Sequence, residues 1–145
     1  ETLKPVNIQK TIADALDRHE GLMTEQGVTA ETDIDGVSVM GGKLLLEVFA
    51  NLVENSLVHA NADSLRISTT VDADTVTIHV EDDGTGISPD ERDNIFERGY
   101  STGETSGSGL GMYIVRQLLD AYEGEVSVAT SEMGGARFDV TLQLA

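Results

Sequence analysis

Four short polar motifs constrain this chain more than any other feature of its sequence. In chain order they are Asn51-Leu-Val-Glu-Asn55 with His59, Asp82-Asp-Gly-Thr-Gly86, Asn94-Ile-Phe-Glu-Arg98 and Gly107-Ser-Gly-Leu-Gly111. Each motif alone is short enough to arise by chance. Their shared order, at separations of a few tens of residues, is far more specific. We therefore expect the motifs to form one site.

In this order the motifs resemble the N, G1, F and G2 boxes of the GHKL ATPase and kinase superfamily. That superfamily includes histidine kinases, gyrase B subunits, heat-shock chaperone ATPases and mismatch-repair ATPases. The resemblance covers roughly residues 40 to 145, and residues 3–21 fit the helix that usually precedes the boxes. It implies an α/β fold of the Bergerat type, a two-layer sandwich that binds ATP or ADP with Mg²⁺.

The spacing of apolar residues predicts the elements of the first half independently of the motifs. The clearest is a helix at 43–60, whose apolar face comprises Leu44, Leu45, Val48, Phe49, Leu52 and Val53. The other expected elements are a helix that includes Val6 and ends near Gly21 or Gly27, a strand pair at 28–34 and 37–40 turning at Asp35-Gly36, and a hairpin of strands at 65–70 and 75–80.

The spacing of apolar residues also predicts the elements of the second half. A helix is expected at 110–122, with Ile114, Val115, Leu118 and Leu119 facing inward. A closing hairpin is expected from strands at 126–128 and 138–144, with Gly134-Gly135 at the turn. Because the strands come in antiparallel pairs, we predict a mixed, largely antiparallel sheet with about three helices on one face.

The first motif places polar residues on one stripe of its helix. Asn51, Asn55 and His59 are spaced by four, and Glu47 extends the stripe. Amide oxygens suit Mg²⁺, which keeps several waters and takes only one or two protein ligands beside phosphates. The resemblance implies that Asn55 is the Mg²⁺ ligand and that Asn51 and His59 contact phosphates or metal-bound water. The alternative is a solvated helix face.

The second motif places a carboxylate where a strand runs into a glycine turn. Such a carboxylate can accept a hydrogen bond from the exocyclic amine of adenine, whereas guanine presents a carbonyl there. In the family pattern this acid is Asp82. The resemblance adds Gly84, Gly86 and Ile87 to the cofactor-binding residues, and Asp83 takes the variable position. The alternative is a plain β-turn.

The remaining motifs flank residues 99–108, which lack apolar periodicity and are expected to form a loop. The resemblance implies that this loop is the lid of the nucleotide site. Free N–H groups at a glycine-rich helix start bind anions. The residues expected to hold phosphate there are Gly107, Ser108, Gly109, Leu110, Gly111 and Met112. Lid contacts are expected from Arg98, Tyr100, Ser101 and Thr102. Phe96 either packs under the lid or belongs to the core.

Two positions depart from the family pattern, and two others help to distinguish the kinase branch from the gyrase-like branch. Val58 stands where many kinases have Lys, and Ala136 stands where many have Thr. Asn51 stands where the gyrase-like branch has the Glu that activates water, and an amide cannot act as a general base. Glu54 resembles an acid of the kinase branch that assists proton removal from the acceptor. The catalytic residues implied by the resemblance are therefore Glu54 and Asn51.

These features favour the catalytic domain of a sensor histidine kinase. Its partners would be a phospho-acceptor histidine helix domain of the same kinase and then a response regulator. His19 lacks the acceptor pattern, so we expect that domain, and the dimer interface of the parent, to lie outside this chain. Two alternatives stay open, a non-catalytic nucleotide sensor and an anti-sigma-type protein-serine kinase of the same fold.

The composition is strongly acidic, with 26 Asp and Glu against nine Lys and Arg, a formal net charge of −17. Such a charge repels nucleic acid and anionic membranes. Self-repulsion of this size needs screening by salt, so we expect a halophilic, haloarchaeal source, with an ordinary acidic bacterial domain as the alternative. The chain has no Cys, which fits a cytoplasmic setting.

The length predicts one domain over residues 1–145, monomeric in isolation and cut from a longer kinase. No run of about 18 apolar residues is present, so we expect no membrane contact by this domain, whether or not the parent is anchored.

Overall fold

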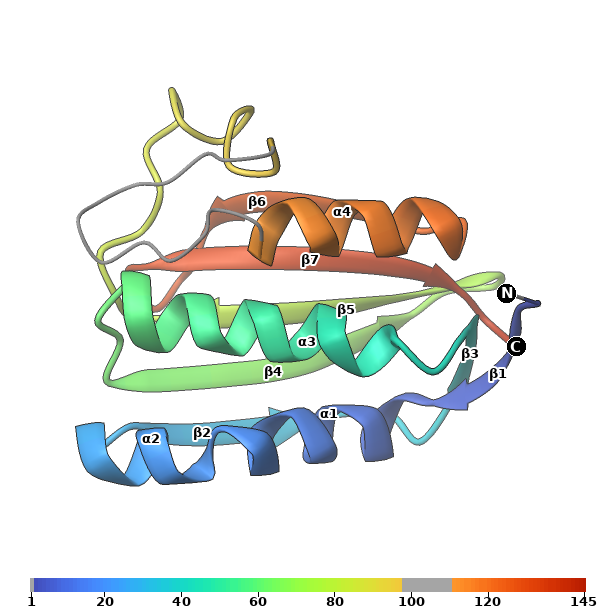
Figure 1. The fold of residues 1–145 in the computed structure, drawn as a ribbon, viewed down its shortest axis with the longest axis horizontal. Helices are drawn as coiled ribbons and strands as arrows, with labels where there is room; N and C mark the ends of the chain where they lie inside the picture. Colours follow the sequence, from blue (N-terminus) through green and yellow to red (C-terminus); the bar gives the residue numbers. More distant parts are fainter. Residues whose placement is uncertain (1, 98–110) are drawn as a thin grey trace.

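The structure, a computed structural model, describes residues 2–97 and 111–145. Within these residues, a five-stranded sheet carries helices on one face, which gives two layers (Figure 1). The sheet has the order β2 (Thr29–Asp33), β4 (Ser64–Val71), β5 (Thr75–Asp82), β7 (Ala136–Gln143) and β6 (Glu125–Thr130). This architecture confirms the predicted α/β sandwich with a mixed, largely antiparallel sheet.

The helical layer is built from α1 (Ile8–Arg18), α2 (Glu20–Gln26), α3 (Leu45–Glu54) and α4 (Gly111–Ala121). Helix α3 lies between α1 and α4 and packs against both (Figure 1). A π-helical turn, η1 (Asn55–His59), extends α3. No helix among the described residues combines the length and the apolar character needed to cross a membrane.

The core lies between the two layers. Helix α3 contributes Leu45, Val48, Phe49, Leu52 and Val53, all buried. Alternate residues of the central strands face them, namely Val76, Ile78 and Val80 of β5 and Phe138, Val140 and Leu142 of β7. Full burial of one such side chain stabilises the fold by about 1.5–3 kcal/mol, so this layer of contacts orients α3 on the sheet.

Two residues predicted to face the core are exposed instead. Leu44 keeps 44% of its surface and Ile114 keeps 38%. Leu44 precedes the first turn of α3, and α4 turns Val115 and Leu119 inward. The apolar stripes are therefore narrower than the sequence pattern predicted.

The N-terminal helix begins later than predicted. Val6 belongs to strand β1 (Lys4–Asn7), which pairs antiparallel with β3 (Ser38–Gly41). Asn7 caps α1, because its side chain accepts a hydrogen bond from the Lys10 backbone N–H at 2.9 Å. The helical segment breaks at His19 and ends at Gly27, which adopts φ +70°.

The strand pair predicted at 28–34 and 37–40 is wrong as a hairpin. Strand β2 pairs in parallel with β4, with Thr29 opposite Ser64, and β3 pairs with β1. The two strands belong to different sheets, so Asp35-Gly36 connects sheets and does not close a hairpin. Both partners lie far away in sequence, where a local pattern carries no information.

The other two hairpins are confirmed. Strands β4 and β5 pair antiparallel up to Val71 opposite Val76, and β6 and β7 pair antiparallel from Thr130 opposite Ala136. The first hairpin ends β5 at Asp82, and the second places its Gly134-Gly135 turn next to that residue.

Candidate nucleotide-binding site

The site is organised around the carboxylate of Asp82, which is 1% exposed. Its Oδ2 accepts a hydrogen bond from the Ser56 hydroxyl at 2.7 Å. Its Oδ1 accepts from the backbone N–H groups of Gly84 at 2.9 Å and Ala136 at 3.2 Å. Three segments distant in sequence therefore hold one buried carboxylate in a fixed orientation. A carboxylate has about four acceptor positions, so one remains for a ligand.

Two positions beside Asp82 require glycine, because neighbouring atoms leave no space there for a Cβ. A Cβ at Gly84 would clash with the backbone of Ala60. A Cβ at Gly135 would clash with the carboxylate of Asp82, while the Gly135 N–H donates to the Asp82 carbonyl at 3.1 Å. Gly84 was predicted from the motif. Gly135 and Ser56 were not, because a hairpin glycine and a serine on a helix do not stand out in a sequence.

The variable position of the second motif has a structural role. The Asp83 carboxylate accepts from the backbone N–H groups of Asp63 at 2.8 Å and Ser64 at 3.0 Å. The hydrogen bond from Ser64, followed by that from Asp63, holds the pKa of Asp83 below its ordinary value. Asp83 therefore fixes the loop that leads from η1 into β4.

The start of α4 lies against the polar stripe of α3. A Cβ on Gly111 would be 3.2 Å from Oδ1 of Asn51, so the two helices approach closely at this point. Asn51 donates through its Nδ2 to the Glu47 carbonyl at 2.8 Å, which turns its oxygen toward α4. The structure thus places Asn51 of the first motif next to Gly111, the one described residue of the last motif.

Asn55 is half-exposed at the junction of α3 and η1. Its side-chain amide has no hydrogen-bond partner among the described residues. The π-helical turn closes through the Ala60 N–H and the Asn55 carbonyl at 3.2 Å. Such turns are frequent at functional sites, and they change the face that later residues occupy. The spacing of four from Asn55 to His59 therefore spans a π-helical turn instead of the α-helical turn that the sequence predicted.

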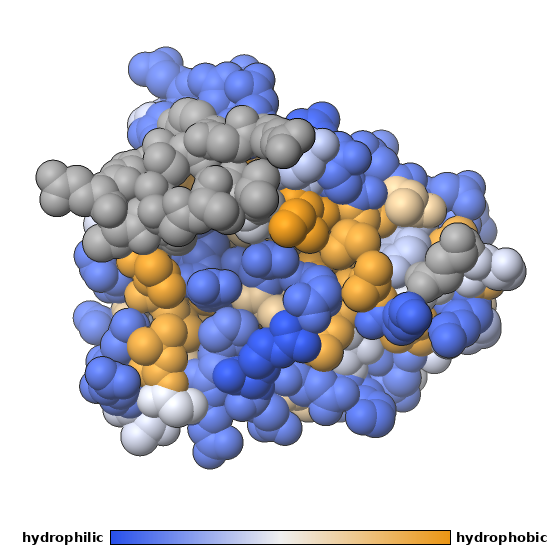
Figure 2. All heavy atoms as spheres, viewed as in Figure 1, coloured by the Kyte–Doolittle hydropathy of each residue, from blue (hydrophilic) through white to orange (hydrophobic). Residues whose placement is uncertain are grey.

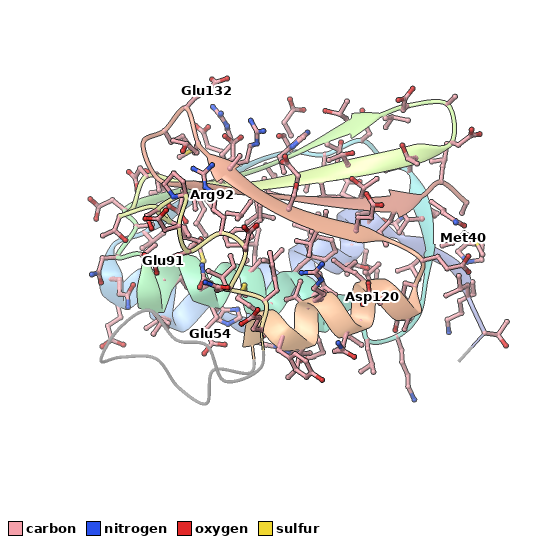
Figure 3. All side chains as sticks on the ribbon, turned by 90° about the horizontal axis from the view of Figure 1, so that it is seen from above. Met40, Glu54, Glu91, Arg92, Asp120 and Glu132 are labelled. Atoms are coloured by element: carbon pink, nitrogen blue, oxygen red, sulfur yellow. The ribbon has the colours of Figure 1, made fainter. Side chains whose placement is uncertain are left out.

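The Glu54 side chain is exposed, on the side of α3 that faces away from the sheet (Figure 3). The Asp82 carboxylate, by contrast, is buried between the layers. The two acids therefore have different environments, and only Asp82 is placed to recognise a buried group.

Phe96 belongs to the core. It is 5% exposed, and its ring meets that of Phe138 edge to face, with centroids 6.3 Å apart. The guanidinium carbon of Arg116 lies 5.7 Å from the Phe96 ring centroid. Phe96 thereby anchors the segment after β5 to the sheet and to α4.

Three further predicted cofactor-binding residues lie around this centre. Gly86 adopts φ +74° and approaches Gly135, while Ile87 and Met112 are partly buried against the core. The predictions for Arg98, Tyr100, Ser101, Thr102, Gly107, Ser108, Gly109 and Leu110 lie outside the described residues.

His79 takes no part in this centre. It lies on the opposite face of the sheet, because Val80 and Asp82 alternate with it along β5. Its ring contacts Thr70 Oγ1 at 2.9 Å and Asp139 Oδ1 at 2.6 Å. His79 is therefore part of the hydrogen-bonded outer face of the sheet.

The described part of the site combines a buried acceptor, a free amide and a glycine at a helix start. An exocyclic amine can meet the remaining acceptor position of Asp82. The amide oxygen of Asn55 is the type of ligand that Mg²⁺ prefers. Gly111 allows the start of α4, where free N–H groups can bind an anion, to lie against Asn51. The donor set therefore fits an adenine nucleotide with a divalent cation.

Comparison with known families agrees with this geometry. Residues 41–145 match the family of histidine kinase-, DNA gyrase B- and HSP90-like ATPases. The chain belongs to this family. As a member of it, the chain is an ATP-binding domain, and it corresponds to the catalytic domain of two-component sensor histidine kinases.

Two sensor kinases illustrate the sequence similarity. Sensor protein kinase CarS of Pseudomonas aeruginosa is 39% identical over 101 residues, 69% of this chain and 22% of CarS. Sensor histidine kinase CpxA of Escherichia coli is 36% identical over 99 residues, 65% of this chain and 21% of CpxA. The chain thus spans about a fifth of the length of these kinases. Neither match supports a halophilic source, which stays a prediction.

Solved structures confirm the fold. The catalytic domain of histidine kinase ThkA superposes with a TM-score of 0.88 at 21% identity, covering 99% of this chain and 96% of that one. Full-length ShkA in complex with AMPPNP superposes with a TM-score of 0.84 at 26% identity, covering 99% of this chain and 31% of ShkA.

Proposed function

We propose that this domain binds Mg²⁺-ATP and donates the γ-phosphate to a histidine on a separate phospho-acceptor helix domain of the same kinase. The phosphate would then pass to a response regulator. Two contacts support this proposal: Ser56, the neighbour of Asn55, donates to the buried Asp82 carboxylate, and Gly111 at the start of α4 lies against Asn51.

Each described residue has a distinct part in the proposal. Asp82 accepts from the adenine amine, Asn55 supplies an oxygen to the metal, and Gly111 lets the start of α4 approach Asn51, where its N–H groups can bind phosphate. Mg²⁺ would neutralise phosphate charge when bound. His59 and the residues predicted at 98–110 complete the phosphate contacts, as the family resemblance implies.

Transfer to a histidine is favoured over hydrolysis by the identity of residue 51. An amide cannot remove a proton from water, and the Asn51 Nδ2 already donates to Glu47. Glu54 is exposed to an incoming acceptor and can take up the proton that the acceptor histidine releases. Catalysis is then mainly the positioning of the acceptor and the γ-phosphoryl group.

The test uses radiolabelled ATP with the 145-residue chain alone and with the phospho-acceptor domain of the parent kinase added as a separate polypeptide. We expect label on the acceptor domain and none on the chain alone, because His19, His59 and His79 lie outside an acceptor motif. Label on the lone chain, or rapid ATP turnover without acceptor, would favour an ATPase instead.

A matched pair of variants tests the role of Glu54. Glu54→Gln removes the carboxylate at constant size, so we expect slower label transfer with unchanged ADP affinity. Glu125→Gln makes the same chemical change at an exposed position of the edge strand β6 and should transfer label at the wild-type rate. Equal rates in both variants would remove Glu54 from catalysis.

A further inference from the structure

The chain has three lysines, and all three line the same groove. Lys4, Lys10 and Lys43 surround a groove of about 340 Å³ between β1, the start of α1 and the segment that leads into α3. Ten residues line this groove, and the other 135 positions of the chain hold no lysine. The lining also includes one acid, Asp14, so three lysines and one aspartate give the groove a formal charge of +2 in a chain with a net charge of −17.

These lysines contribute little to the fold. Lys10 pairs with Asp14 at 3.0 Å, but the Lys10 side chain is 75% exposed, and such surface pairs are weak. Neither Lys4 nor Lys43 has an ion-pair partner among the described residues. Arg18 and Arg66, by contrast, both pair with glutamates.

The positions of the lysines also do not favour their helices. Lys10 lies in the first turn of α1, and Lys43 lies just before α3. The N-terminus of a helix carries a partial positive charge, so a cation there is unfavourable. The lysines therefore add their charge to the partial positive charge of the two helix N-termini. This arrangement does not stabilise either helix.

We propose that this lysine groove is a docking surface for an acidic segment of a partner protein. Carboxylates of the segment would pair with Lys4, Lys10 and Lys43. Its apolar side chains would contact Val6 and Leu46, which also line the groove. This inference goes beyond nucleotide binding and phosphotransfer and does not depend on either.

Charge complementarity and the size of the patch favour an acidic peptide over a nucleic acid. A nucleic acid presents a long row of phosphates, which the net charge of −17 on the chain repels. Figure 2 shows that hydrophilic residues cover much of the helical face. Three separated ammonium groups around a partly apolar groove suit a few carboxylates spaced along a short segment.

The lysine groove lies away from the nucleotide site. In Figure 1, β1 and the starts of α1 and α3 lie at one end of the molecule, and the end of α3 lies at the other. Asn51 and Asn55 are at that second end of α3. A docked segment would therefore leave the nucleotide site accessible, and both ligands can bind together.

The probe for this surface is a fluorescein-labelled decapeptide of alternating Glu and Leu, titrated with the chain by fluorescence anisotropy. We expect saturable binding at about 50 mM KCl that is lost near 1 M, where the Debye length is about 3 Å. Lys4→Gln/Lys43→Gln should weaken binding about fivefold or more. Arg18→Gln/Arg137→Gln, which removes the same charge elsewhere, should leave it unchanged.

Carbodiimide coupling identifies the contact directly, since these are the only side-chain amines of the chain. The peptide should couple to Lys4, Lys10 or Lys43, and the triple Lys→Arg variant should bind the peptide without coupling through a side chain. Equal binding by the lysine and arginine double variants would overturn the proposal. Two competition results would also overturn the proposal. Displacement of the peptide by ADP would assign the peptide to the nucleotide site, and displacement by triphosphate at equal concentration would assign it to a small-anion site.

Discussion

Replacing Asp82 with asparagine should separate nucleotide binding from folding. In the variant, the amide oxygen can still accept from the Gly84 and Ala136 N–H groups, as Oδ1 does in the wild type. The new NH₂ group faces Ser56, whose hydroxyl can rotate to accept a hydrogen bond in place of donating one. The new amide keeps its partners, but the proton of the buried Ser56 hydroxyl loses its acceptor, so unfolding should become easier by about 1–3 kcal/mol, the cost of one unpaired buried donor.

Nucleotide binding should weaken for a separate reason. The acceptor left for the adenine amine becomes a donor, so two N–H groups face each other. A hydrogen bond to a charged group contributes about 1.5–3 kcal/mol, and each 1.4 kcal/mol is tenfold in affinity, so ADP should bind roughly ten- to hundredfold more weakly. Because guanine presents a carbonyl at that position, the preference for ADP over GDP should fall as well.

Calorimetry with ADP and GDP measures the affinities, and thermal unfolding measures the stability. Asp83→Asn is the matched control, because it makes the same change of charge one residue away and keeps an oxygen for Asp63 and Ser64. Unchanged ADP affinity in a folded Asp82→Asn variant would remove Asp82 from the site. A variant that no longer folds would refute the hydrogen-bond exchange at Ser56.

Three further outcomes are expected. Asn55→Asp keeps an oxygen ligand but adds charge beside the triphosphate, so Mg²⁺-ATP binding should drop while the fold survives; equal affinities by calorimetry, with and without chelator, would contradict this. The pKa of Asp83 is lowered in the folded state, so its carboxylate contributes stability above its ordinary pKa, and this stability is lost as pH falls through the folded-state pKa. In urea unfolding at a series of acidic pH values, the free energy of unfolding should therefore decrease less steeply with falling pH in Asp83→Asn than in the wild type. Parallel pH profiles of the two proteins would refute this contribution. The melting temperature should rise from about 0.1 to 2 M KCl as the net charge of −17 is screened, and a flat profile would argue against a halophilic source.

The elements that sequence reasoning placed correctly are those whose determinants are local. The hairpin of β4 and β5 follows from alternation on both sides of a polar turn, and α3 follows from its apolar stripe. The parallel pairing of β2 with β4 could not be predicted in the same way, because 30 or more residues separate the paired positions, such as Thr29 and Ser64. Val6 shows the same limit, since one apolar residue fits a helix and a short strand equally well.

The same difference between local and tertiary determinants applies to the residues of the candidate site. Asp82 and Gly84 belong to a motif, so the sequence alone was enough to propose them as candidates. Ser56 and Gly135 matter because the fold places them against Asp82, and each has an unremarkable local context. A serine that donates to a buried carboxylate and a hairpin glycine that makes room for it can be found only from tertiary contacts.

The hydrogen bonds around Asp82 also bear on how long the protein survives. The acceptor for the base exists only when residues 56, 84 and 136 have converged, so an unfolded chain offers no comparable site. A ligand that binds only the folded state stabilises it by mass action, by about 2.7 kcal/mol at a concentration 100-fold above Kd. ATP would then act as a folding ligand as well as a phosphate donor. Depletion of the nucleotide would increase the fraction of unfolded chains that proteases can degrade.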